Sequence, residues 1–177
     1  MSNLLMRRSS LRDLPSPPAL PTGYELREYH PDDLDATAAM MRRAFEDESW
    51  TPQRFTEALV GAPDVVKTYV VCDQNGLPVA TASARLMPEQ FPHSGYVHWV
   101  AVDPTHRGQQ LGAVVTLAVL QEFVRQGCTD AVLETQDERL PAIRIYRKLG
   151  FEPEHSDVSH PERWAQVLSN LLAAANL

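Results

Sequence analysis

Apolar residues along the chain recur with a period of two in some segments and with a period near 3.6 in others, which predicts both strands and helices. Strands are predicted over residues 24–29, 68–72, 79–86, 96–102 and 131–135. Asn75 and Gly76 give a strong turn signal between the second and third strands. Helices are predicted from Asp32, from Thr51, over residues 111–126 and 140–149, and from Ser159 onward.

The order of these elements predicts an α/β fold with a mixed central β-sheet and helices on both of its faces. The strand over 96–102, the helix over 111–126 and the strand over 131–135 follow one another with short connections. Such a strand-helix-strand unit is almost always a right-handed crossover, and we therefore expect the two strands to run parallel.

Residues 1–22 differ in character from the rest. Pro15, Pro17, Pro18 and Pro21 fall close together, a spacing that forbids helix and favours an extended, polyproline-like backbone. We interpret residues 1–22 as a Pro-rich leader that is not part of the core. Residues 23–177 are expected to form a single domain.

The composition favours a cytoplasmic protein with small-molecule chemistry. Of the 177 residues, 44% are hydrophobic and 22% are charged, and the formal net charge is -7. An acidic chain is a poor partner for nucleic acid and suits a cationic substrate better. The most apolar run, from Leu111 to Leu120, is too short to span a membrane. Cys72 and Cys128 lack the spacing of metal ligands, so no metal is expected.

The segment Val97–Val115 carries the most informative pattern, a strand followed by a polar loop and a long apolar helix. Gly108 and Gly112 allow a ligand to approach the backbone closely. Free N–H groups of the loop and the helix N-terminus attract an anion, and Arg107 adds a positive charge. This combination suits a pyrophosphate.

The run Arg107-Gly108-Gln109-Gln110-Leu111-Gly112 resembles the coenzyme A signature R/Q-x-x-G-x-G/A of the GCN5-related N-acetyltransferase (GNAT) family. Gln110 stands where that signature has its first glycine. The segment Arg139–Phe151 is similar to a later motif of the family, with Ala142 and Tyr146 in the matching places and Arg139 where Asn is common. The resemblance covers about residues 23–151 and weakens afterwards, because the family usually closes with two more strands.

The resemblance implies a GNAT-like fold in which the parallel strands 96–102 and 131–135 splay apart. Acetyl-coenzyme A would lie in that opening, with its pantetheine arm paired to the backbone near Val100 and Val102. Its pyrophosphate would bind the loop from Arg107 to Ala113, which sets the predicted cofactor-binding residues. These are Val100, Val102, Arg107, Gly108, Gln110, Gly112 and Ala113.

Two side chains are candidate catalytic groups. Tyr146 matches the position of the family's proton donor, which would protonate the leaving thiolate; the alternative is a packed core tyrosine. His98 shares a strand face with Tyr96 and Val100 and could accept a proton from the amine, with an ordinary pKa near 6.5. A merely structural histidine is an equal alternative. Glu134 ranks low, as a polar residue at a strand edge that could bind a cationic substrate.

The predicted function is N-acetyl transfer from acetyl-coenzyme A to an amine by direct attack. The acceptor stays open among a small amine, an antibiotic, a peptide N-terminus and a lysine side chain. One alternative is a coenzyme A-binding sensor or interaction module without turnover, and another is an interaction protein with a Pro-rich arm. No membrane or nucleic-acid partner is expected, and the apolar C-terminal helix could pair two chains as a homodimer.

Overall fold

The computed structural model describes residues 3–173. The termini of the predicted leader and domain, residues 1–2 and 174–177, lie outside the described residues. The strands are β1 (Leu4–Arg8), β2 (Glu25–Glu28), β3 (Val65–Cys72), β4 (Pro78–Leu86), β5 (Ser94–Val102), β6 (Asp130–Thr135) and β7 (Glu152–Glu154). The helices are α1 (Leu34–Phe45), α2 (Pro52–Phe55), α3 (Leu111–Arg125), α4 (Leu140–Lys148) and α5 (His160–Ala173), with short helical turns η1 (Pro31–Asp33), η2 (Thr56–Val60) and η3 (Pro104–His106).

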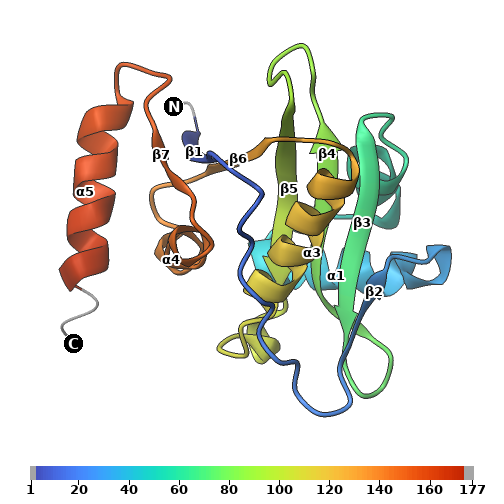
Figure 1. Cartoon of the computed structure of the whole chain (residues 1–177). Coiled ribbons are helices and arrows are strands. Elements are labelled where there is room, and N and C mark those ends of the chain that lie inside the picture. Colours follow the sequence, from blue (N-terminus) through green and yellow to red (C-terminus); the bar gives the residue numbers. More distant parts are fainter. Residues whose placement is uncertain (1–2, 174–177) are drawn as a thin grey trace.

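The strands form one sheet in the order β2-β3-β4-β5-β6-β1-β7. Strands β5 and β6 are parallel, and all other neighbours in this sheet are antiparallel. Helix α3 crosses one face of the sheet while α1 lies behind it (Figure 1). The predicted mixed sheet, its helices on both faces and the parallel β5-α3-β6 unit are confirmed.

Each face of the sheet has its own apolar core. Helix α3 is buried along nearly its whole length, which explains why its sequence lacks a polar face. On the opposite face a smaller cluster joins α1, α2 and η2, with Trp50 and Phe55 at its centre. Thr51 caps α2 as its spacing before Pro52 suggests, with its Oγ1 accepting a hydrogen bond from the Arg54 N–H at 3.1 Å.

The interpretation of residues 1–22 as a leader outside the core is wrong for residues 4–8, because these residues form the inner strand β1. Strand β1 pairs with β6 on one side and with β7 on the other. Leu4 and Met6 are fully buried, and Leu11 also lies in the core. The short strand is held by the buried Leu4 and Met6 and by both of its backbone edges, which find hydrogen-bond partners in β6 and β7.

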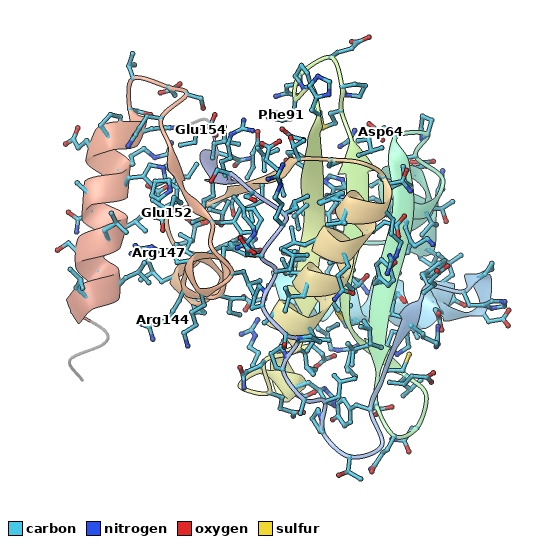
Figure 2. All side chains as sticks on the ribbon, in the orientation of Figure 1. Asp64, Phe91, Arg144, Arg147, Glu152 and Glu154 are labelled. Carbon is cyan, nitrogen blue, oxygen red and sulfur yellow. The ribbon has the colours of Figure 1, made fainter. Side chains whose placement is uncertain are left out.

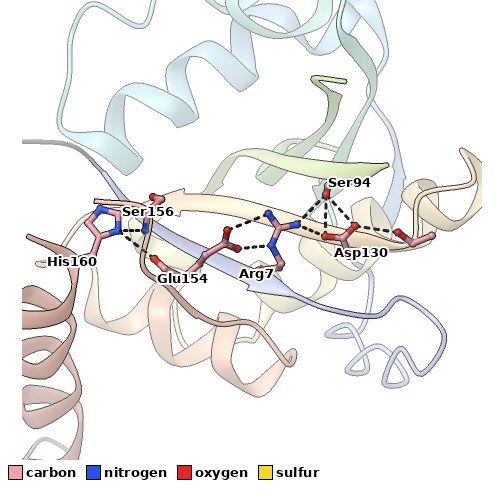
Figure 3. Close-up of polar contacts among 7 residues, drawn as sticks. Arg7, Ser94, Asp130, Glu154, Ser156 and His160 are labelled. Atoms are coloured by element: carbon pink, nitrogen blue, oxygen red, sulfur yellow. Dashed lines mark hydrogen bonds and ion pairs between the residues drawn. The ribbon is translucent and has the colours of Figure 1, made fainter. Parts of the chain in front are cut away.

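Arg7 ties β1 to its neighbours through a polar cluster (Figure 3). Its guanidinium donates to the carboxylates of Glu154 on β7 and Asp130 on β6, and to the Ser94 Oγ at 3.1 Å. Ser94 in turn donates to Asp130 at 2.9 Å. Because the cluster is half-buried and multiply bonded, it fixes the register of the inserted strand more firmly than a single surface ion pair does.

Within residues 3–173, the two strands that usually close the sheet in the resembled family do not both come from the C-terminal part of this chain. One position in the sheet is taken by the short β7 and the other by β1. Figure 2 shows Glu152 and Glu154 along β7, and Arg144 and Arg147 at α4, in the part of the molecule next to α5. The Arg147 guanidinium lies 3.7 Å from the Glu152 carboxylate, and Arg144 donates to the Leu171 carbonyl of α5 at 3.4 Å.

Strands β5 and β6 pair over only part of their length. Their parallel pairing runs from Ser94 to Val97 on β5 and ends there. Beyond it, β5 bulges against β4, and Trp99 takes a positive φ of 48°. Strand β6 continues beside β1 instead, so an opening forms between β5 and β6. Among residues 3–173 no helix is both long and apolar enough to cross a membrane.

Candidate active site

Two neighbouring cavities open where β5 and β6 separate. One has a volume of about 370 Å³ and lies between the end of β5, the start of α3 and α4. The other, of about 440 Å³, lies along the side chains of β5 and β6. The two cavities share five lining residues, which form the junction between them: Phe45, Val100, Arg139, Ala142 and Tyr146.

The first cavity, here called the loop cavity, collects most of the predicted cofactor-binding residues. Val100, Val102, Arg107, Gly108, Gln110 and Gly112 all line it. Among the described residues, no backbone carbonyl accepts a hydrogen bond from the N–H groups of Gly108, Gln110 or Gly112. These unpaired donors at the start of α3 provide the electrostatic environment that a pyrophosphate requires.

Backbone conformation explains the glycines of this loop. Gly108 has a φ of +82°, and a Cβ there would meet no atom within 4 Å, so the backbone is open to a ligand. Gln110 has a φ of 59°, the left-handed conformation that glycine adopts more easily. Gln110, which replaces the signature glycine, therefore carries a side chain in a backbone conformation that favours glycine.

Gly112 and Ala113 lie deeper than the loop. A Cβ on Gly112 would lie 3.4 Å from the Ile145 Cδ1 and 3.5 Å from the Val102 Cγ2, so the glycine lets α3 approach both β5 and α4. Ala113 does not line either cavity at this junction, and its N–H already donates to the Gln110 carbonyl at 3.0 Å. Its predicted contact with a coenzyme finds no support in this geometry.

Asp103 fixes the turn between β5 and the loop. Its buried carboxylate accepts hydrogen bonds from the Thr105 N–H at 3.0 Å and from the Arg43 guanidinium at 2.6 Å. Burial alone would raise the pKa of Asp103, but the bonds from Thr105 and Arg43 outweigh it and lower that pKa to about 2. The ionised side chain thereby connects α1 to the edge of the loop cavity.

Tyr146 stands at the junction of the two cavities. Its side chain is buried with 7% exposure, and no hydrogen bond joins its hydroxyl to another described residue. Burial raises the pKa of Tyr146 to about 12, and the Arg139 guanidinium acts weakly in the opposite direction. The hydroxyl is therefore protonated at neutral pH and can donate a hydrogen bond or a proton into the opening.

His98 lines the second cavity, here called the wall cavity, as the strand pattern predicts. Burial lowers the pKa of His98 to about 4, and the Arg85 guanidinium lowers it further, while a hydrogen bond to the Ala58 carbonyl acts against both. The sequence suggests His98 as the base for the amine because an ordinary histidine has a pKa near 6.5, and the pKa in the folded chain is well below that value. At neutral pH the imidazole is neutral and is a weak base.

Sequence reasoning misses much of the wall cavity. Phe45 comes from the end of α1, Trp99 from the bulge of β5, and Asn3 from the segment just before β1. These residues are far apart in sequence and share no motif, and so only the fold brings them together. Glu134, which ranks low in the sequence, also lines this cavity. Among residues 3–173 no group of three or more His, Cys, Asp or Glu side chains is placed to bind a metal.

Comparison with known proteins identifies the class of fold that builds this site. The model of the acetyltransferase (GNAT) family matches residues 27–151. The chain belongs to this family. The match covers β2 through α4, and therefore the bulged β5, the loop cavity and Tyr146.

Curated relatives are longer than this chain. It is 33% identical over 166 residues to a mycothiol acetyltransferase of Actinosynnema mirum, with 89% of this chain and 54% of the relative covered. It is 32% identical over 174 residues to a mycothiol acetyltransferase of Saccharomonospora viridis, with 90% and 56% covered. The chain thus spans about half the length of these relatives.

Solved structures show the same fold. A GCN5-related N-acetyltransferase from Sphaerobacter thermophilus aligns with a TM-score of 0.67 at 23% identity, covering 86% of this chain and 48% of that chain. One from Kribbella flavida aligns with a TM-score of 0.58 at 27% identity, covering 85% and 54%.

Proposed function

We propose that this chain transfers an acetyl group from acetyl-coenzyme A to a primary amine. The observation that carries the proposal is the junction of the two cavities at Tyr146. A thioester in the loop cavity and an amine in the wall cavity would meet there, and holding two reactants in one geometry supplies much of the rate of such a reaction.

The loop cavity suits coenzyme A for three reasons. Its unpaired N–H groups at the start of α3 suit a pyrophosphate, the open backbone at Gly108 allows close approach, and Arg107 adds charge. The end of β5 near Val100 and Val102 no longer pairs with β6, so its backbone groups are available to a pantetheine arm.

The reaction we propose is a direct attack without a covalent enzyme intermediate. The acceptor ammonium first loses a proton to water, and its nitrogen then bonds to the thioester carbonyl carbon. The carbon-sulfur bond breaks, and the coenzyme thiolate takes a proton from the Tyr146 hydroxyl. The second amine proton leaves to solvent, and the Tyr146 tyrosinate regains a proton from solvent. His98, neutral in the wall cavity, would accept a hydrogen bond from the attacking amine.

The acceptor we propose is a small molecule. The wall cavity has a volume of about 440 Å³, within the ordinary range of small-ligand sites, and it is bordered by aromatic side chains. Two relatives are named as mycothiol acetyltransferases, which supports a small-molecule acceptor over a protein.

A screen for turnover tests the proposal. The wild-type chain is incubated with acetyl-coenzyme A and a library of small primary amines, and release of free thiol is followed. We expect amine-dependent release, with acetylated product of matching mass. Tyr146→Phe keeps the ring and should lower kcat about 100-fold or more with little change in coenzyme affinity.

The control is Tyr24→Phe, a half-buried tyrosine outside both cavities, which should keep the wild-type kcat. A kcat of Tyr146→Phe within a few-fold of wild type would show that Tyr146 is only a packing residue. Coenzyme binding without thiol release for any amine would favour the inactive coenzyme-binding module.

A further inference from the structure

We propose that Glu134, positioned by Asn3 from the N-terminal segment, binds the ammonium group of the acceptor, while Phe45 and Trp99 pack against the acceptor's apolar flank. The inference rests on the proposed function, because it assigns the acceptor class of the wall cavity. That class is a small primary amine with a flat apolar group near the nitrogen.

The place of Glu134 in the sheet points its carboxylate toward the wall cavity. Val132 on β6 pairs with Tyr96 on β5, and Glu134 is the next residue on the same face of β6. At this position β5 has already separated from β6, so no strand covers the side chain from that direction. Glu134 and Tyr96 both line the wall cavity.

Asn3 holds the carboxylate in place. Its side-chain Nδ2 donates to the Glu134 Oε2 at 3.0 Å, a bond between residues 131 positions apart in sequence. Asn3 immediately precedes β1, whose pairing of Leu4 with Thr135 brings it to the end of β6. The negative charge of Glu134 also contributes, after burial, to the raised pKa of Tyr96.

Of the other charged side chains of the wall cavity, Asp47 is ion-paired, and Arg139 contacts a ring and an amide oxygen. Asp47 lies 3.0 Å from the Arg54 guanidinium and also accepts bonds from Ser49. The Arg139 guanidinium stacks 4.8 Å from the centre of the Phe45 ring and donates to the Gln136 Oε1 at 2.9 Å. Glu134 has no basic side chain within 4.0 Å among the described residues, so its charge is available to a cationic ligand.

Aromatic rings form another part of the cavity lining. Phe45 and Trp99 meet edge to face with their ring centres 5.4 Å apart, and Trp50 packs behind Trp99 at 4.7 Å. Both Phe45 and Trp99 are half-buried, so part of each ring faces the cavity. Such rings bind flat apolar groups well and also attract cations.

The test uses two probes with the same carbon skeleton, 2-phenylethylamine with a charged ammonium and 2-phenylethanol with a neutral hydroxyl. Calorimetry with the full chain measures both dissociation constants at neutral pH. We expect the wild type to bind the amine about five-fold tighter than the alcohol, as for a single exposed ion pair. In Glu134→Gln this preference should vanish while the alcohol binds as before.

A matched control and a second variant sharpen the result. Glu138→Gln removes an exposed carboxylate four positions along the chain and outside both cavities, and it should keep the preference. Asn3→Ala should reduce the preference without abolishing it, because the carboxylate remains but is less well oriented.

An undiminished preference in Glu134→Gln, or no binding of either probe to the wild type, overturns the inference. Failure of the proposed function has a different signature. A chain that binds the amine through Glu134 but transfers no acetyl group retains the ammonium site and loses the enzyme.

Discussion

Gln110 carries a side chain in a backbone conformation that favours glycine, and this has a measurable consequence. Its φ is 59°, and it caps α3 without a side-chain hydrogen bond. We expect Gln110→Gly to raise the free energy of unfolding by up to about 1 kcal/mol, because the strain of a left-handed residue disappears. Coenzyme affinity should rise or stay equal, since the glycine also clears the loop cavity.

Gln109→Gly is the matched control for this prediction. Gln109 does not have a positive φ, so a glycine there gains nothing in the folded state and adds freedom to the unfolded chain. Denaturant titrations should place the two variants on opposite sides of the wild type. Equal destabilisation of both variants would show that Gln110 is not strained.

The His98 environment changes what a pH profile should show. With its pKa lowered to about 4, the imidazole is neutral over the whole range from pH 5.5 to 9. We expect kcat/KM in that range to follow the basicity of the acceptor amine, because the ammonium has no lone pair for attack. Two acceptors of different basicity should give limbs displaced by the difference between their pKa values.

His98→Gln serves as the comparison, since an amide can still accept a hydrogen bond. It should leave the position of both limbs unchanged. A limb near pH 6.5 that is common to both acceptors and absent from His98→Gln would restore His98 as the general base.

Single residues show which parts of the site a sequence can reveal. The glycine-bearing loop and Tyr146 lie in contiguous motifs, and both line the loop cavity. Asn3, Phe45 and Trp99 lie in segments without any shared pattern, and the lowered pKa of His98 depends on how deeply the fold buries it. Properties that arise from burial and from distant segments need the folded structure.

At the scale of elements, the turn after β5 depends on an ionised Asp103. Its pKa of about 2 in the folded chain lies below the ordinary 3.8, so ionisation favours the folded state. That stabilisation is complete above about pH 4 and is lost as the pH falls toward 2. The shift corresponds to about 2 kcal/mol at neutral pH.

Asp103→Asn should therefore lower the free energy of unfolding by about 2 kcal/mol at pH 7, with the difference from wild type shrinking toward pH 2. Urea titrations across this range measure it. Asp13→Asn, at an exposed site, should leave the curve unchanged. A pH-independent difference for Asp103→Asn would mean that the carboxylate acts through packing and not through its charge.

Elements with a long apolar period or a clear capping signal are predictable, and short strands that lack both, such as β1 and β7, are not. The predicted helix over residues 111–126 appears as α3 (Leu111–Arg125), and the strand over 96–102 lies within β5 (Ser94–Val102). Strand β1 has five residues and stands before a run of prolines, so no local signal separates it from a surface arm. Its place is decided by the free edge of β6, which lies far away in sequence.

At the scale of the whole molecule, the N-terminal segment supplies an inner strand of the sheet. It separates β6 from β7, brings Arg7 against three neighbouring strands and places Asn3 in the wall cavity. Removing residues 1–21 would therefore remove core side chains together with the Pro-rich stretch. Such a truncation does not distinguish a Pro-rich docking arm from an enzyme, because in either case the sheet would lose an inner strand.

Point substitutions measure the contribution of this strand instead. Leu4 is fully buried, whereas Leu172 on α5 is 69% exposed, so the two leucines form a matched pair. We expect Leu4→Ala to lower the free energy of unfolding by about 2–5 kcal/mol, and Leu172→Ala to change it by less than about 0.5 kcal/mol.

A cavity left at Leu4 should also weaken the pairing that positions Asn3. Acetyl transfer in Leu4→Ala should then show a raised KM for the amine at temperatures where the chain is still folded. Equal stability of the two variants would mean that β1 lies on the surface and that residues 1–22 are a leader after all.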